Sequence, residues 1–307
     1  MSAPPATTAR RTNPESPRKM KSLTVQAALE EGRHALSARA GAEARHEALY
    51  LLAGVLGLTA GRTGLERDRV LDQRQLEEYR SRLARRAGGE PLQYIEGRAA
   101  FRQLDLRVSP AVLIPRPETE QLLDRILDWS AGRTGLSAVD IGTGSGAIAI
   151  SLAVEGPFER VVAVDISAAA LNLARENAFT AGVANRLDLR HGSLFEVLGS
   201  GERFHAVVSN PPYVALGESD SLPEEVRAWE PGTALYAGAT GIEVIRQLVE
   251  GAPDYLYVGG LFALELAPDL AAETVKLIAD RGRYREARVL RDLAGRERMV
   301  LAEHRGR

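Results

Sequence analysis

The chain has 307 residues, of which 45% are apolar, 26% are charged and none is cysteine, and its formal net charge is −2 at pH 7. This length is enough to bury a core in two domains, and the small net charge offers no global basic field for a nucleic-acid partner. Without cysteine, the chain has no disulfide, thiolate zinc site or cysteine nucleophile, and no metal is expected because the histidines lack ligand spacing. No apolar run is long enough to span a membrane, so we expect a cytoplasmic protein.

The first 90 residues fall into two parts. Residues 1–21 are rich in Ala, Pro, Thr, Ser and Arg, with Glu15 as the one acid. Such a composition cannot bury a core and predicts a disordered tail. Residues 22–90 show apolar stripes at helical spacing, which predicts a domain of about four helices with Gly61 and Gly64 marking a connection. This domain carries no catalytic constellation, so its expected role is substrate recognition or that of a lid.

Residues 91–115 change period. Leu104, Leu106 and Val108 alternate with polar residues, which is typical of a half-exposed strand. We interpret the segment as a β-hairpin linker, with residues 94–97 on its first arm. The stretch 113–120 then opens a helix, and its prolines and acids are ordinary capping residues.

From residue 116 to residue 307 strand and helix patterns alternate. The expected strands are 138–141, 161–164, 187–189, 206–208 and 261–266, and helical patterns such as 168–180 and 242–256 lie between them. This alternation predicts an α/β domain with a parallel, doubly wound sheet, whose ligands bind at the carboxyl ends of the strands. Residues 286–290 and 298–302 flank Ala294-Gly295-Arg296 and predict a terminal hairpin.

A glycine-rich loop follows the first of these strands. Its residues are Gly142, Thr143, Gly144, Ser145 and Gly146. The first two glycines permit a sharp turn and a close approach to a ligand, and the third permits the next helix to pack near the strand. This pattern fits a dinucleotide such as NAD as well as S-adenosylmethionine.

Asp165 ends the next strand, where its carboxylate can accept hydrogen bonds from both hydroxyls of an adenosine ribose. A helix N-cap is the alternative role, although Ser167 can serve that purpose. Asp140 would oppose a pyrophosphate but can pair with an ammonium or lie near a sulfonium, which favours S-adenosylmethionine. Leu194, after the third strand, is expected to lie against the adenine.

The stretch Asn210-Pro211-Pro212-Tyr213 ends the fourth strand. The prolines cannot continue a strand, and they hold Asn210 in an extended conformation. The result is a stiff corner that presents the Asn210 amide, a proline carbonyl and one aromatic face. Asn210 Oδ1 and the carbonyl of Pro211 can each accept a hydrogen bond from a planar substrate nitrogen. A simple turn after a core strand remains the alternative.

Taken together, these motifs resemble the class I S-adenosylmethionine-dependent amino-methyltransferases. Within them, the chain resembles the protein-(glutamine-N5) methyltransferases that modify peptide-chain release factors. The narrower likeness rests on residues 94–97 with Phe101, on residues 112–120, and on Glu230-Pro231 with Ala234-Leu235.

The resemblance implies a Rossmann-like sheet of seven strands that ends in an antiparallel hairpin. It implies that S-adenosylmethionine, with S-adenosylhomocysteine as its product, contacts residues 142–146, Asp165, Leu194 and Asn210. It also implies that residues 210–213 bind the glutamine of a Gly-Gly-Gln loop, with Asn210, Pro211 and Tyr213 at the reacting atoms. We expect a monomer whose partner is the release factor, with no direct contact to nucleic acid.

Three other functions stay open at this point. Methylation of a glutamine in a ribosomal protein uses the same chemistry. An adenine or cytosine amino-methylase also acts on a planar nitrogen, but it would call for a basic surface and stacking aromatics, and 5% of this chain is aromatic. An NAD-dependent oxidoreductase would leave the Asn-Pro-Pro-Tyr corner unexplained.

Overall fold

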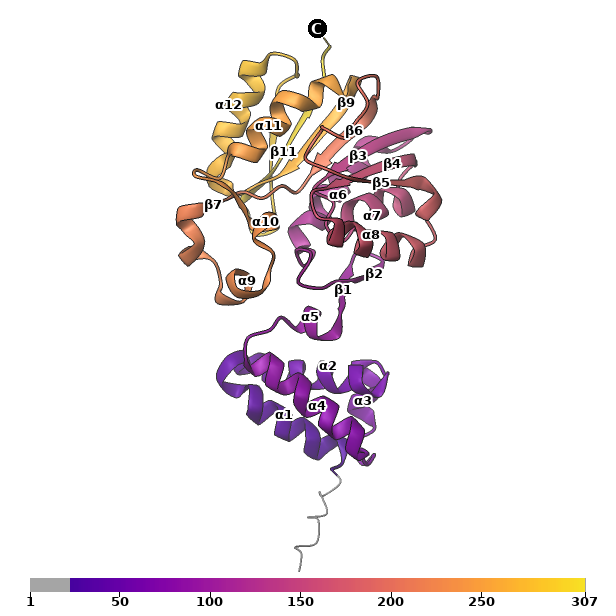
Figure 1. The fold of residues 1–307 in the computed structure, drawn as a ribbon, viewed down its shortest axis with the longest axis vertical. Coiled ribbons are helices and arrows are strands. Elements are labelled where there is room, and N and C mark those ends of the chain that lie inside the picture. The colour runs from indigo at the N-terminus through magenta and orange to yellow at the C-terminus, as the bar shows by residue number, and fades with distance from the viewer. Residues whose placement is uncertain (1–22, 307) are drawn as a thin grey trace, which may run out of the picture. The chain divides into compact units, whose positions relative to one another are not determined.

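A computed structural model describes residues 23–306 of the chain. The chain divides into two compact units, the first ending at Ala87 and the second beginning at Gly88 (Figure 1). The predicted tail, residues 1–21, lies outside the described residues.

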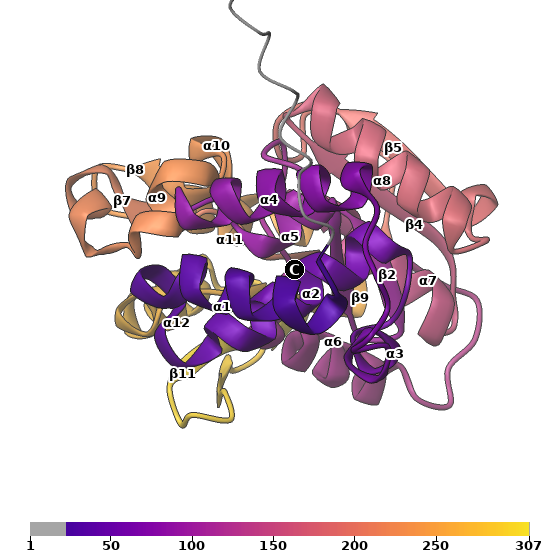
Figure 2. The same ribbon diagram turned by 90° about the horizontal axis from the view of Figure 1, so that it is seen from below.

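The first unit is helical, as the apolar stripes predicted. Its helices are α1 (Val25–Ala40), α2 (Ala44–Leu56), α3 (Ala60–Leu65) and α4 (Gln73–Ala87). Helices α1 and α4 lie side by side (Figure 2), and the buried Tyr79 of α4 donates its hydroxyl to the carbonyl of Ala48 in α2. Gly61 and Gly64 were expected in a connection, but they lie inside α3, which begins at the capping hydroxyl of Thr59.

The second unit is built on a seven-stranded sheet with the order β10-β11-β9-β6-β3-β4-β5. Its strands are β3 (Leu136–Ile141), β4 (Phe158–Asp165), β5 (Leu187–His191), β6 (Phe204–Ser209), β9 (Leu256–Glu265), β10 (Arg288–Arg291) and β11 (Glu297–Glu303). Neighbours from β5 to β9 run parallel, whereas β10 and β11 form an antiparallel hairpin paired to β9. Each strand predicted after residue 116 is present, and the terminal hairpin is confirmed.

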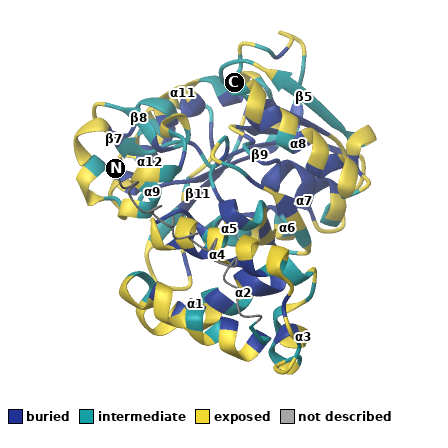
Figure 3. Cartoon of the chain, turned by 60° about the horizontal axis from the view of Figure 1, so that its bottom comes forward, coloured by how far each residue is buried: buried dark blue, intermediate teal, exposed yellow. Residues whose placement is uncertain are grey.

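Helices cover both faces of this sheet. Helices α6 (Pro117–Ser130), α7 (Ala147–Glu155) and α8 (Ala168–Thr180) pack on one face, where Leu122, Leu152 and Phe158 belong to one core. Helices α11 (Glu243–Gly251) and α12 (Ala271–Arg281) pack on the other. The central strands are buried, whereas the outer faces of the helices are exposed (Figure 3). Burial on both faces explains the continuous apolar runs of these strands.

The segment before α6 differs from the expected hairpin. Residues 94–97 were predicted on its first arm, but Tyr94 and Ile95 lie in a short helix, α5 (Leu92–Glu96). Pro91 precedes this helix, and Gly97 ends it in the left-handed conformation with a φ of 68°. The hairpin itself is formed by β1 (Arg98–Phe101) and β2 (Leu104–Arg107).

Two further differences lie between β6 and β9. The chain forms an insertion not anticipated from the sequence, with β7 (Val214–Ala215) paired to β8 (Tyr236–Gly238), and α9 (Glu224–Trp229) and α10 (Gly232–Leu235) between them. The helix expected over 242–256 ends at Gly251, because Pro253 initiates a 3-10 turn that leads into β9.

Asn177 of α8 joins the β-hairpin to the glycine-rich loop. Its amide oxygen accepts from the backbone N–H of Arg107 at 2.7 Å, and its amide nitrogen donates to the carbonyls of Arg107 and Ser145. The side chain is buried at 3% exposure. Its hydrogen bond to the Ser145 carbonyl is buried, and the two to Arg107 are partly buried, which limits competition from water.

We expect Asn177→Ala to lower the free energy of unfolding by about 1–3 kcal/mol, because it leaves one buried and two partly buried backbone groups without their partner. Urea denaturation followed by circular dichroism measures this change. Asn172→Ala on the same helix is the matched control, since Asn172 is exposed and accepts only from Arg175 in the described structure. Equal stability of the two variants would contradict the structural role of Asn177.

Candidate active site

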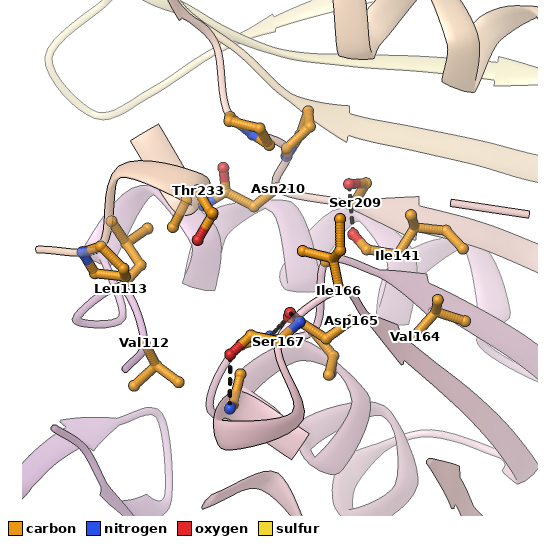
Figure 4. A pocket seen from close by; sticks show the side chains of 18 of the residues that line it. Val112, Leu113, Ile141, Val164, Asp165, Ile166, Ser167, Ser209, Asn210 and Thr233 are labelled. Atoms are coloured by element: carbon orange, nitrogen blue, oxygen red, sulfur yellow. Dashed lines mark hydrogen bonds between the residues drawn. The ribbon is translucent and has the colours of Figure 1, made fainter. Parts of the chain in front are cut away.

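A cavity of about 360 Å³ opens at the carboxyl ends of β3, β4 and β6 (Figure 4). Of the residues singled out in the sequence, the cavity wall includes Gly142, Thr143, Gly144, Ser145, Asp165, Leu194, Asn210, Pro211 and Pro212. Gly146 and Tyr213 do not line it. The cavity thus brings the glycine-rich loop, the strand-end carboxylate and the proline corner together.

The glycine-rich loop is held in place by Asp140 of β3. Gly142, Gly144 and Gly146 all have positive φ, between 56° and 84°. A Cβ on Gly146 would lie 2.8 Å from the Ile150 side chain, so glycine permits the close packing of the following helix. Asp140 Oδ2 accepts from the Thr143 hydroxyl at 2.6 Å and from the backbone N–H of Ala149. These bonds fix the loop against the start of α7.

Asp140 itself does not reach the cavity. Its side chain is fully buried, and its Oδ1 has no hydrogen-bond partner among the described residues. Burial raises the pKa of Asp140 to about 7, although the hydrogen bonds from Thr143 and Ala149 act in the opposite direction. From the sequence, this carboxylate could pair with an ammonium or lie near a sulfonium. The observed contacts make it instead a support of the loop.

Asp165 lies on the other side of the loop. Its Oδ2 accepts from the backbone N–H of Gly144 and its Oδ1 from that of Ser167, both at 2.8 Å. Ser167 provides the N-cap of α8, as foreseen, so Asp165 is not needed for that purpose. Burial raises the pKa of Asp165, and the two backbone hydrogen bonds partly offset that effect. Because a carboxylate has about four acceptor positions, two stay available to a ligand in the cavity.

Leu194 has a strained backbone. Its φ is 48°, which is uncommon for a residue with a branched side chain. The preceding turn is fixed because the N–H of Gly192 donates to the carbonyl of Asp165, and a Cβ on Gly192 would collide with Val197. The positive φ of Leu194 costs conformational energy, and this conformation brings Leu194 to the cavity wall.

The proline corner begins at Asn210. The amide nitrogen of Asn210 donates to the Thr119 hydroxyl at 3.1 Å, and that hydroxyl donates to Glu265 Oε2 at 2.7 Å. Tyr213 is partly buried, packs against the core beneath α11 and α12, and has a pKa raised by burial. The role predicted for Tyr213 beside a substrate stays a prediction.

The first turn of α6 is anchored to distant parts of the unit. Arg116 forms an ion pair with the buried Glu230, just before α10. Glu118 pairs with Arg296 of the terminal hairpin. The sequence alone offered only capping for this stretch. The first turn has the proline and two acids that favour a helix start, although Arg116 at the N-cap makes no side-chain capping bond, and the same turn brings Thr119 to the cavity.

Other contributors had no sequence signal of their own. Thr119, Asn177 and Glu265 are polar residues on helix or strand patterns, where a polar side chain is usually solvent-facing. All three are buried here. Their positions become apparent only when α6, α8 and β9 are placed around the sheet.

The sheet order, the loop after β3 and the carboxylate after β4 are those of a Rossmann-like methyltransferase. Residues 27–97 match the family described as the PrmC N-terminal domain, and residues 119–225 match the methyltransferase small domain. Among solved structures, the chain is similar in fold to a 16S rRNA N2 G1207 methyltransferase of T. thermophilus, with a TM-score of 0.52 and 22% identity, over 68% of this chain and 50% of that one. A methyltransferase from Pyrococcus furiosus gives a TM-score of 0.50 and 23% identity, over 74% and 99% of the two chains.

The chain is also similar to curated relatives over nearly its whole length. It is 40% identical to the release factor glutamine methyltransferase of Moorella thermoacetica over 283 residues, which are 92% of this chain and 99% of the relative. It is 43% identical to that of Gloeobacter violaceus over 246 residues, or 78% and 86% of the two chains. The chain belongs to the release factor glutamine methyltransferase family. This membership excludes the oxidoreductase alternative.

The raised pKa of Asp140 predicts a pH-dependent stability. Between about pH 4 and 7, the folded chain keeps a proton on Asp140 that the unfolded chain has already lost. Stability therefore falls as pH rises through this window, by at most about 1.4 kcal/mol per pH unit for one proton. Asp140→Asn removes this effect. The difference in unfolding free energy, variant minus wild type, should increase with pH up to about 7 and then stay level.

Urea denaturation at several pH values between 5 and 8.5 measures this difference. A constant offset between the two proteins reflects the lost acceptor or altered packing and does not affect the slope. A difference that is independent of pH would show that Asp140 is ionised throughout the range.

Proposed function

We propose that this protein transfers a methyl group from S-adenosylmethionine to the side-chain amide nitrogen (N5) of the glutamine in the Gly-Gly-Gln motif of peptide-chain release factors. The observation that carries the proposal is the shared cavity. One wall presents the Asp165 carboxylate, and the other presents Asn210 with its amide nitrogen already bonded to Thr119. Family membership, through relatives named release factor glutamine methyltransferase, supports the same reaction.

The residues of the cavity fit S-adenosylmethionine. A volume of about 360 Å³ lies within the range of small-molecule sites. The space above Gly142 and Gly144 is open, because a Cβ at either position would meet no atom within 4 Å. Asp165 would accept hydrogen bonds from two ribose hydroxyls, and Leu194, which lines the same cavity, would contact the adenine. The cofactor would supply a methyl group on a positively charged sulfur.

The proline corner suits a primary amide. A glutamine nitrogen is a poor nucleophile, because its lone pair is delocalised into the carbonyl, so it has to be oriented toward the methyl group. Asn210 Oδ1 and the carbonyl of Pro211 would accept its two N–H groups. These bonds gain strength as positive charge develops on the nitrogen. Positioning of this kind contributes about 7–11 kcal/mol in favourable cases, and the proton leaves after methyl transfer.

The remaining parts of the proposal concern the partner. The helical unit, residues 23–87, would help to bind the release factor, and Tyr213 would pack against the glutamine amide. Because release factors act in translation, the enzyme would work in the cytoplasm, and we propose a monomer. Within residues 23–306 the structure contains no helix that is long and apolar enough to cross a membrane.

Methyl transfer from labelled S-adenosylmethionine to a purified release factor tests the proposed function. Label should appear on the glutamine of the Gly-Gly-Gln motif, as mapped by mass spectrometry, and it should be absent when that glutamine is replaced. Label on a ribosomal protein or on nucleic acid, with none on the release factor, would establish one of the alternative substrates instead.

Asn210→Ala should lower kcat by roughly 100-fold or more, because it removes an acceptor that stabilises developing charge. The affinity for S-adenosylmethionine, measured by calorimetry, should weaken less. Asn172→Ala is the control for an asparagine remote from the cavity. Turnover that matches the control would remove Asn210 from the chemistry.

Asp165→Ala should raise the KM for S-adenosylmethionine by roughly 10- to 100-fold, because hydrogen bonds to a charged group are lost. The kcat at saturating cofactor should change less. Asp165→Asn is the matched variant, since its amide oxygen can still accept from the backbone N–H of Gly144. Unchanged cofactor affinity in Asp165→Ala would show that the ribose contact is absent.

A further inference from the structure

Three polar side chains from distant elements form one chain of hydrogen bonds at the cavity. Glu265 ends β9, Thr119 lies in the first turn of α6, and Asn210 follows β6. Asn210 Nδ2 donates to Thr119 Oγ1 at 3.1 Å, and Thr119 Oγ1 donates to Glu265 Oε2 at 2.7 Å. Thr119 and Glu265 are buried, at 4% and 1% exposure. Glu265 does not line the cavity, and the Thr119 hydroxyl, which does, is engaged with Glu265 and Asn210, so we treat the contribution of both residues as indirect.

We propose that Thr119 and Glu265 are positioning residues that fix which end of the Asn210 amide faces the cavity. This inference rests on the proposed function, in which Asn210 Oδ1 accepts a hydrogen bond from the substrate amide. The oxygen and nitrogen of an amide have nearly the same shape, so packing alone does not distinguish the two orientations. A neighbouring group that can only accept, or only donate, a hydrogen bond does distinguish the two orientations.

The polarity follows from the number of protons. A hydroxyl has one proton to donate, and an ionised carboxylate has none. The Thr119 proton is therefore used on Glu265, and the Thr119 oxygen is left to accept. Of the two ends of the Asn210 amide, the nitrogen alone can donate. The NH₂ end is thus held at Thr119, and Oδ1 is presented to the cavity as the acceptor that a substrate N–H requires.

The rigidity of Thr119 supports this role. Its backbone N–H bonds to the carbonyl of Arg116, and the ion pairs Arg116–Glu230 and Glu118–Arg296 hold the flanking residues. A helix end anchored on two sides gives the hydroxyl a defined position. The Thr119 hydroxyl therefore sets the orientation of the Asn210 amide and does not adapt to it.

Protonation of Glu265 reverses the polarity. A neutral carboxyl can donate to Thr119, whose own proton is then free to bond Asn210 Oδ1, which turns the NH₂ end toward the substrate. Burial raises the pKa of Glu265 to about 7, and the Thr119 hydrogen bond lowers it. Glu118 raises the pKa further, and Arg298 of β11 and Arg116 lower it. The phenol of Tyr213 is the other titratable group influenced by this carboxylate.

The decisive comparison is between Thr119→Val, which keeps the shape of the side chain without the hydroxyl, and Thr119→Ser, which keeps the hydroxyl. Both are assayed with purified release factor and S-adenosylmethionine. We expect Thr119→Val to lower kcat by roughly 10- to 100-fold, with cofactor affinity by calorimetry close to wild type. Thr119→Ser should restore most of the activity. Thr274→Val, a buried threonine in α12 that bonds to the Leu270 carbonyl, controls for the loss of any buried hydroxyl.

The pH dependence of kcat gives a readout that a structural role would not change. Wild-type kcat should fall as pH decreases through about 7, and this acidic limb should be lost in Glu265→Gln and in Thr119→Val. The inference would be overturned if Thr119→Val kept the kcat of the wild type, or if Thr119→Val and Thr119→Ser lost equal activity. It would also be overturned if the wild type, Glu265→Gln and Thr119→Val showed the same pH profile of kcat. A wild-type enzyme that leaves the release factor unmethylated refutes the proposed function itself, before any variant is compared.

Discussion

The loop after β3 is the constraint on which the site depends, and two carboxylates hold it, the buried Asp140 and the half-buried Asp165. Asp140 binds it from within the sheet through the Thr143 hydroxyl, and Asp165 binds it from the neighbouring strand through the N–H of Gly144. Parallel pairing of β3 with β4 and β6 brings these groups to one edge of the sheet. Because glycines supply the positive φ values, the loop can lie low enough to leave a cavity above it. The position of this loop therefore determines where the proposed contacts to cofactor and substrate can form.

Around that loop, polar side chains from several elements form hydrogen-bond networks. Asn177 connects the loop to the β-hairpin, and the Glu265–Thr119–Asn210 chain connects β9, α6 and β6. Such networks are costly when a member is missing and rigid when all are present. The rigidity matters because methylation of an amide depends on orientation more than on acid or base strength. The architecture of the cavity and the chemistry of the proposed reaction thus place the same demand on the chain.

Much of this arrangement could be predicted from the sequence, for identifiable reasons. Strands of the parallel sheet appear as short apolar runs, and Gly142, Asp165 and Asn210 each stand directly after one, so their meeting at one edge follows from topology. Elements without such a signal were missed. Residues 94–97 were assigned to a strand because the alternation downstream was extended over them, whereas Pro91 and Gly97 delimit a helical turn. Thr119 and Glu265 were missed because their partners lie 91 and 146 residues away in the chain.

The place of β11 in the sheet affects how the enzyme is made. This strand lies between β10 and β9, and Met299 pairs with Glu265, so the strand that comes last along the chain completes the surroundings of a residue proposed to orient Asn210. During synthesis, β9 keeps a long, apolar, unpaired edge until translation has passed Glu303. Such an edge is a template for misassociation with other chains. Nascent chains stalled before that point should therefore be both inactive and dependent on chaperones.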